Sequence, residues 1–215
     1  WCELFYPGRL IHLPFLYRKA TRKEYIPYWS LLLRGLVTQH KTLLAGIKLF
    51  GCGILYLLLK IQTPDDYDVR MPFLVFSVAL LGHGALIYGM RGMEEEKLLF
   101  YRSMPVPLFK RLLQYMILYL LVLLPEIITI GWLMPGHIRI KDALGFVSAG
   151  YSTLLLLNSC LFIISLQRSD FIKLSLGVFG ILYFGVLSDS LILLSGLFLL
   201  TAGSLFFGGY CRKEG

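Results

Sequence analysis

The sequence lacks the signatures of several common protein classes. It contains no G-x-x-x-x-G-K-[ST] run, so this chain is not expected to be an ATPase. The four histidines show no HExxH spacing, and none of the four cysteines forms a CxxC pair. We therefore expect no metal site, no disulfide framework and no catalytic residue set, and we interpret the cysteines as small hydrophobic residues.

Acidic residues are scarce, with 13 Asp and Glu against 21 Lys and Arg and a net charge of +8. In a soluble protein this excess would favour nucleic-acid binding. Here the basic residues cluster at the ends of apolar runs, which is typical of a membrane protein. We therefore expect the basic residues to lie beside a lipid bilayer, and we expect no nucleic-acid partner.

Hydrophobic residues are abundant instead, at 57% of the chain, whereas soluble domains have about 45–50%. Several apolar runs reach the length of about 17–25 residues that a membrane-spanning helix needs. They predict six spans, at about residues 43–61, 72–90, 109–134, 143–166, 171–187 and 190–209. The last two are short and glycine-rich, so a hairpin that does not fully cross the membrane is the alternative for them.

Two segments precede the spans. Residues 1–27 are aromatic, basic and proline-containing, and are interpreted as a cytoplasmic, membrane-proximal segment. Residues 28–42 predict an amphipathic interfacial helix, because Trp29, Leu32, Leu33, Leu36 and Val37 recur at helical spacing. The alternative is a plain extension of the first spanning helix. A six-helix transmembrane domain over 43–210 and a cytoplasmic tail over 211–215 complete the predicted organisation.

The distribution of basic residues predicts the topology. With the N-terminus in the cytoplasm, every Lys and Arg lies on the inner side except Lys60, Arg70, Arg139 and Lys141. In this count Lys48, near the start of the first span, extends its side chain to the inner interface. The expected fold is thus an all-α, multi-pass protein of the cytoplasmic (inner) membrane with both termini inside.

This topology places the stretch 91–111, the most polar interval between two long apolar runs, in the cytoplasm. Its three consecutive acids would favour the first turn of a short helix, because carboxylates are stabilised at a helix N-terminus. Apolar and aromatic residues follow, as at protein interfaces, and two prolines then stiffen the connection to the third span. The alternative is a solvated loop. The residues of interest are Glu94, Glu95, Glu96, Leu98, Leu99, Tyr101, Arg102 and Pro105.

The order of elements, together with this stretch, resembles the permease subunits of ABC-2 type exporters. The family carries acids in the cytoplasmic loop between its second and third spans, followed by leucine and a hydrophobic-Pro-hydrophobic element. The matching residues here are Glu94–Glu96, Leu98 and Leu99, and Met104–Val106, with Pro107 where the family has a hydroxyl residue.

The resemblance implies a transport subunit of an ATP-driven exporter that is not itself an enzyme. It would pair with a second permease copy, identical or homologous, and with separate ABC ATPase subunits that bind the ATP and magnesium. The stretch 91–111 would then be the coupling helix that receives the movement of the ATPase.

Polar residues inside the spans are candidates for a translocation path or a dimer interface. They are His83, Tyr115, Tyr119, Glu126 and Asn158. Pro125 is expected to kink the third span. Two alternatives stay open: Glu126 lies near the outer interface or caps the break at Pro125, and His83 is a packing residue.

Two other functions remain in competition with transport. An intramembrane enzyme acting on lipid or glycan would use His83 with Glu126 or Asp189, but these residues are scattered along the sequence. The other is a non-transporting membrane scaffold subunit.

Overall fold

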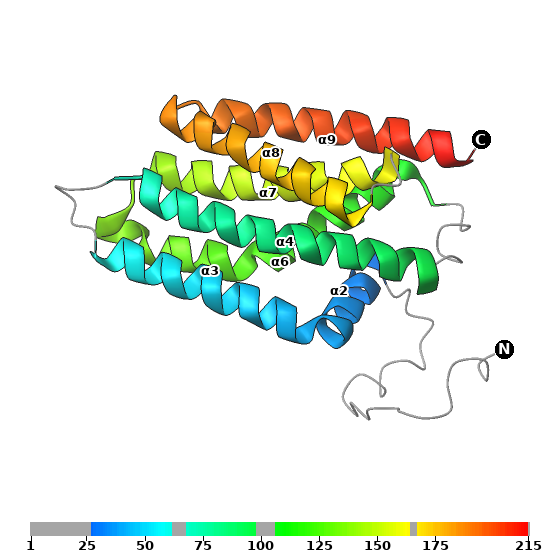
Figure 1. The fold of residues 1–215 in the computed structure, drawn as a ribbon, viewed down its shortest axis with the longest axis horizontal. Coiled ribbons are helices and arrows are strands. Elements are labelled where there is room, and N and C mark those ends of the chain that lie inside the picture. Colours follow the sequence, from blue (N-terminus) through cyan, green and yellow to red (C-terminus); the bar gives the residue numbers. More distant parts are fainter. Residues whose placement is uncertain (1–26, 62–67, 98–105, 164–166, 215) are drawn as a thin grey trace.

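The computed structural model describes residues 27–61, 68–97, 106–163 and 167–214. This part of the chain is entirely helical and contains no strand (Figure 1). The helices are α2 (Tyr28–Gln39), α3 (Lys41–Ile61), α4 (Arg70–Lys97), α6 (Leu108–His137), α7 (Ile140–Ile163), α8 (Arg168–Leu187) and α9 (Leu191–Glu214).

Six of these helices, α3, α4, α6, α7, α8 and α9, are long and apolar enough to cross a membrane. Each coincides with one predicted span, which confirms the six-helix prediction for the described residues. The shortest, α8, has 20 residues, or about 30 Å of helix, which matches the hydrocarbon thickness of a bilayer. Its length therefore does not require an incomplete hairpin.

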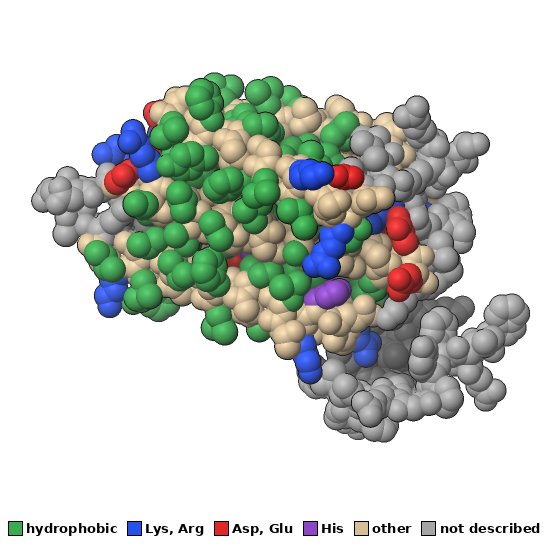
Figure 2. Space-filling view, viewed as in Figure 1, with side chains coloured by type: hydrophobic (Ala, Val, Ile, Leu, Met, Phe, Trp, Pro, Cys, Tyr) green, Lys and Arg blue, Asp and Glu red, His purple; other side chains and the backbone are tan. Residues whose placement is uncertain are grey.

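Large hydrophobic side chains cover much of the face of the bundle that Figure 2 shows. Leu49, Trp132 and Leu193 are each at least 75% exposed. Monomeric soluble proteins rarely expose contiguous apolar surface on this scale. Together with the six apolar helices, this surface indicates a multi-pass membrane protein.

The helices run alternately between two ends of the bundle (Figure 1). The end that carries α2 is called the α2 end, and the opposite one the far end. At the far end, Asp189 adopts a positive φ of 53° after α8, and the following Ser190 amide donates back to Gly185, as in a Schellman helix terminus. Asp189 also pairs with Lys141 at 2.7 Å.

The core is centred on α7, whose Phe146, Ala149 and Leu154 are fully buried. The α7 helix packs along α9 and also contacts α4 and α6. The Phe146 ring stacks on Phe76 of α4 at 5.8 Å. Gly150 of α7 makes room for the Phe76 ring, since a Cβ at position 150 would lie 2.8 Å from the Phe76 Cζ atom. Aromatic packing thus fixes α7 against α4.

The first described helix, α2, ends at His40, which has non-helical backbone angles, and α3 begins at the next residue. The alternative of one continuous helix over 28–61 is therefore wrong. The buried face of α2 consists of Tyr28, Leu32 and Leu36. Val37 was expected on this apolar face but is exposed. The α2 helix packs on α4, α6 and α3, so much of its apolar face is covered by protein.

The α4 helix continues through Lys97, well beyond the predicted end of the second span at residue 90. The expectation that Glu94–Glu96 form the first turn of a separate helix is therefore wrong: they lie in the last turns of α4. Carboxylates are disfavoured by the helix dipole at that end. Arg91 offsets this, because it pairs with Glu94 at 3.0 Å and with Glu95 at 3.1 Å.

Candidate functional site

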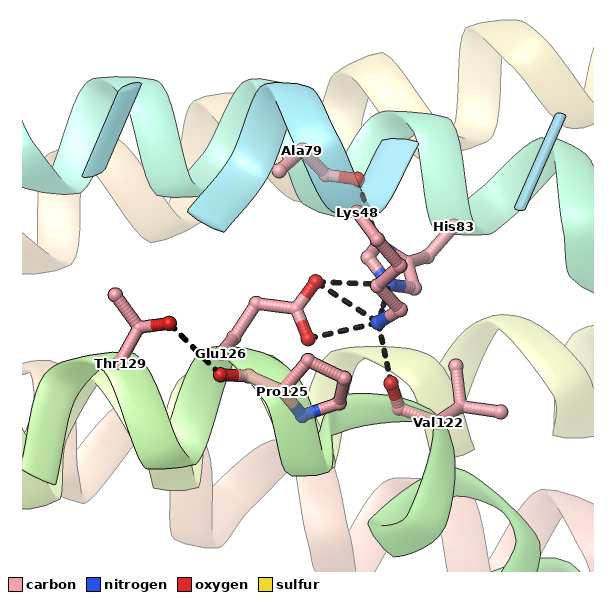
Figure 3. A network of polar contacts seen from close by, with 7 residues as sticks. All are labelled: Lys48, Ala79, His83, Val122, Pro125, Glu126 and Thr129. Atoms are coloured by element: carbon pink, nitrogen blue, oxygen red, sulfur yellow. Dashed lines mark hydrogen bonds and ion pairs between the residues drawn. The ribbon is translucent and has the colours of Figure 1, made fainter. Parts of the chain in front are cut away.

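Three ionisable side chains from three spanning helices meet inside the bundle (Figure 3). Lys48 comes from α3, His83 from α4 and Glu126 from α6, and we call them the mid-membrane triad. His83 lies about 20 Å from the start of α4 and Glu126 about 27 Å from the start of α6. Both helices exceed 40 Å by the same rise per residue, so the triad lies well away from either end.

The Lys48 ammonium is the centre of the triad. Its Nζ lies 2.8 and 2.7 Å from the two carboxylate oxygens of Glu126 and 2.7 Å from His83 Nε2. It also donates to the Val122 carbonyl. An ammonium has three hydrogens, so these four acceptors satisfy it fully. The expectation that Lys48 extends to the inner interface is therefore wrong.

The tautomer of His83 follows from its second contact. His83 Nδ1 lies 2.7 Å from the carbonyl oxygen of Ala79, which can only accept, so Nδ1 carries the hydrogen. In a neutral imidazole Nε2 is then an acceptor, which suits the Lys48 ammonium. Glu126 Oε1 lies 3.4 Å from the same Nε2. A neutral histidine leaves one positive and one negative charge, so the triad has no net charge.

Local sequence features allow this meeting. Pro125 lacks an amide N–H, so the Leu121 carbonyl one turn earlier has no helical donor. The carbonyl of the next residue, Val122, accepts from Lys48. The backbone remains helical through Pro125. On α3, a Cβ at Gly51 would lie 3.0 Å from the Ala79 Cβ and 3.6 Å from Glu126 Oε1. Glycine at that position therefore lets α3 approach α4 and α6 beside the triad.

A second polar group, the Glu94 cluster, lies at the α2 end and consists of Tyr28, Arg91, Glu94 and Tyr115. Glu94 Oε1 accepts from the Tyr28 hydroxyl at 2.5 Å and from the Tyr115 hydroxyl at 2.6 Å. Glu94 Oε2 accepts from Arg91 Nη1 at 3.0 Å. One buried carboxylate thus joins α2, α4 and α6.

Aromatic rings enclose the cluster. The Arg91 guanidinium lies 4.1 Å from the centre of the Phe162 ring of α7, within the range of a cation–π contact. Phe206 of α9 packs edge-on against both Phe162 and Tyr115. The cluster therefore connects α2, α4 and α6 to α7 and α9 as well.

Tyr28 is the residue through which α2 enters the cluster. Its ring packs edge-on against Tyr115 at 6.0 Å. Burial, and then the adjacent Glu94 carboxylate, raises the pKa of the Tyr28 hydroxyl well above its ordinary value. The hydroxyl therefore stays protonated and remains a donor to Glu94 over the whole physiological pH range.

The predicted site residues divide between several places. Tyr115 and Glu126, two of the candidates for a translocation path, are both buried, but Tyr115 belongs to the Glu94 cluster and Glu126 to the triad. Tyr119 stacks on Tyr115, and Asn158 is buried on α7. Of the predicted coupling residues, Glu94 is buried, whereas Glu95 and Glu96 are exposed. Leu98, Leu99, Tyr101, Arg102 and Pro105 lie outside the described residues.

Sequence reasoning missed two participants, Lys48 and Tyr28. Lys48 was assigned to the membrane interface because a lysine near a helix start commonly extends to it. A pairing argument could have identified Lys48. Lys48 and Glu126 each lie in an apolar helix, and opposite charges buried in a membrane pair with one another. Tyr28 carries no comparable signal, because its role depends on how α2 folds back onto α4.

The triad resembles an intramembrane acid–base site in its residue types but leaves no room for a substrate. His83 and Glu126 are each about 1% exposed, and Lys48 occupies the space between them. Asp189, the other acid considered for an enzyme, pairs with Lys141 at the far end instead. In the described part of the chain, no three His, Cys, Asp or Glu side chains gather as metal ligands would. The arrangement can hold three helices together and can release them when the ion pair opens.

Comparisons with known proteins identify no relative of this chain. No protein-family model, no curated protein and no solved structure matches it.

Proposed function

We propose that this chain is the membrane subunit of an ATP-driven exporter of the ABC-2 type, coupled to a separate ATPase that binds ATP and magnesium. In this proposal the α2 end faces the cytoplasm of the inner membrane. A second permease copy completes the transport unit. The observation that carries the proposal is the sharing of the buried Glu94 carboxylate by Tyr28 and Tyr115.

The shared carboxylate supports coupling because of its position in the chain. Glu94 lies three residues before Lys97, the described end of α4, and it belongs to the stretch 91–111 that resembles a coupling helix. Force applied to that stretch would reach α4 first. It would pass through Glu94 to α2 and α6, because all three helices bond to the same side chain. The exposed Glu95 and Glu96 remain accessible to a partner.

The same movement of α4 would also act on the mid-membrane triad. The α4 helix carries Glu94 and His83, 11 residues or about 16 Å apart, and α6 carries Tyr115 and Glu126 at the same separation. A relative shift of α4 and α6 would therefore act on both polar groups at once. Opening the Lys48–Glu126 pair would change the packing of α3 against α6 halfway across the membrane.

The test is whether a separate ABC ATPase assembles with this chain. Replacing Glu95, Glu96 and Tyr101 together is expected to abolish co-purification of the ATPase and transport, while the chain still inserts in the membrane. The matched control is Lys141→Gln with Asp189→Asn, which removes exposed charges at the far end and is expected to change neither. If the triple variant keeps both assembly and transport, the coupling proposal is wrong.

An intramembrane enzyme is the second candidate, and one observation favours it. His83 Nε2 and Glu126 Oε1 lie 3.4 Å apart, although the residues are far apart in the chain. Turnover of a lipid or glycan by the purified chain alone, abolished by His83→Asn, would favour this candidate over transport. A scaffold role would be favoured if the ATPase binds but no substrate moves.

A further inference from the structure

A groove on the lipid-facing surface lies between α3 and α8, with α4 as its floor. Its volume is about 400 Å³, within the range of small-ligand pockets. It exists because α3 and α8 each pack on α4, whereas the described backbones of α3 and α8 do not approach each other closely. The small residues Ala85 and Gly89 of α4 form part of its floor.

The groove is amphipathic along its length. At the α2 end it is lined by His40, at the junction of α2 and α3, and by Arg168, the first residue of α8. Toward the middle of the bundle its lining becomes apolar, with Leu43, Leu81 and Leu176. Leu81 lies eight residues from Gly89, so the groove follows α4 for about 12 Å. Figure 2 shows a histidine and a basic side chain close together at the border of a hydrophobic surface, with acidic side chains nearby at the same end.

The positive end of the groove has no internal counter-charge. No Asp or Glu is among the described residues that line it. Asp170, the nearest acid along α8, pairs with Lys173 at 3.1 Å. Within the described part of the chain, no ion pair or hydrogen bond involves the Arg168 guanidinium or the His40 imidazole. The His40 ring lies against Gly89, since a Cβ there would be 2.9 Å from Nε2.

We propose that this groove binds one anionic phospholipid. The headgroup phosphate contacts Arg168 and His40, and one acyl chain lies along Leu43, Leu81 and Leu176. An arginine fork matches phosphate oxygens and gives charge-assisted hydrogen bonds, and the N-terminus of α8 adds a positive dipole end at the same place. Basic pockets between membrane helices bind such headgroups. A bilayer lipid supplies both the charge and the chain that the groove accommodates, and the site is independent of the proposed transport activity.

The test is lipid retention by the purified full chain, measured by native mass spectrometry. Phosphatidylglycerol and phosphatidylcholine with identical acyl chains are added at equal concentration. The parent chain is expected to retain one phosphatidylglycerol molecule in preference to phosphatidylcholine. Arg168→Gln is expected to lower phosphatidylglycerol retention about tenfold, because a hydrogen bond to a charged group is lost. Added inorganic phosphate is expected not to displace the lipid.

The control is Lys173→Gln, which removes the same charge from the same helix but lies outside the groove. It is expected to keep the parent's preference. Equal losses in Arg168→Gln and Lys173→Gln would overturn the proposal, because charge alone would then explain retention. Equal retention of the two lipids by the parent chain would also overturn it, and so would displacement by phosphate. A second variant, Ala85→Trp, fills the floor of the groove and is expected to release the lipid without any change in charge.

Discussion

Replacing Glu126 by glutamine is the sharpest perturbation of the mid-membrane triad. Glutamine keeps the size of the side chain but removes its charge, so the Lys48 ammonium is left without its counter-ion. Breaking a buried pair by neutralising one partner costs about 3–5 kcal/mol. Lys48 retains 17% exposure of its side chain and can partly withdraw toward the surface. We therefore expect a loss near the lower limit, about 3 kcal/mol.

For a chain of this size, each kcal/mol shifts the midpoint of thermal unfolding by about 2–4 °C. Glu126→Gln should therefore lower the midpoint by about 6–12 °C. The assay is thermal unfolding of the purified chain in detergent, followed by tryptophan fluorescence. Glu96→Gln is the matched control, because Glu96 is an exposed glutamate on α4. A surface change of that kind stays within about 0.5 kcal/mol, so its midpoint should move by about 2 °C or less.

Two further variants separate an ion pair from simple packing. Lys48→Met combined with Glu126→Gln removes both charges, and we expect it to be more stable than Glu126→Gln alone, because no buried charge remains unpaired. Lys48→Met alone should cost less than Glu126→Gln, because His83 lies 3.4 Å from Glu126 and can take up a proton to replace the ammonium. A midpoint for Glu126→Gln within 2 °C of the parent would refute the reasoning, as would a double variant no more stable than the single one.

Three other predictions address the Glu94 cluster, the core and the topology. Tyr28→Phe removes a hydrogen bond to a buried carboxylate and should destabilise the chain by about 1.5–3 kcal/mol, measured by the same unfolding assay. Gly150→Ala should cost about 1–3 kcal/mol because the new methyl group meets a stacked ring, whereas Gly203→Ala, with open space around it, should be neutral or stabilising by up to about 1 kcal/mol. In intact cells a membrane-impermeant thiol reagent should label Lys141→Cys but not Lys173→Cys, and the reverse pattern would invert the predicted orientation.

Local sequence properties account for what could be predicted of the fold. A run of apolar residues long enough to cross a bilayer is visible without knowing its neighbours, and all six runs correspond to helices in the structure. The end of α4 could not be placed in the same way. Hydropathy falls at Arg91, but the helix continues to Lys97. It continues because Arg91 bonds to both Glu94 and Glu95 one turn later, which stabilises a charged extension that hydropathy alone does not detect.

The consecutive acids Glu94–Glu96 show why the site was harder to predict than the fold. In the sequence they form one uniform acidic group. On a helix, successive residues point about 100° apart, so Glu94 faces the core and Glu95 and Glu96 face outward. Which acid turns inward is decided by the tyrosines that meet it, and these come from positions 28 and 115. No local pattern contains that information.

The two polar groups are more informative together than separately. A single buried ion pair inside a membrane bundle can be explained as a device for specifying helix register. Here α4 and α6 contribute to both groups, at matched separations of 11 residues. Each group adds a different third helix, with α2 in the Glu94 cluster and α3 in the triad. Since α2 and α3 are consecutive and separated only by His40, a displacement of α4 against α6 would act on both sides of that junction. In the proposed coupling, the His40 junction is therefore where we expect a movement of the α2 end to pass to α3.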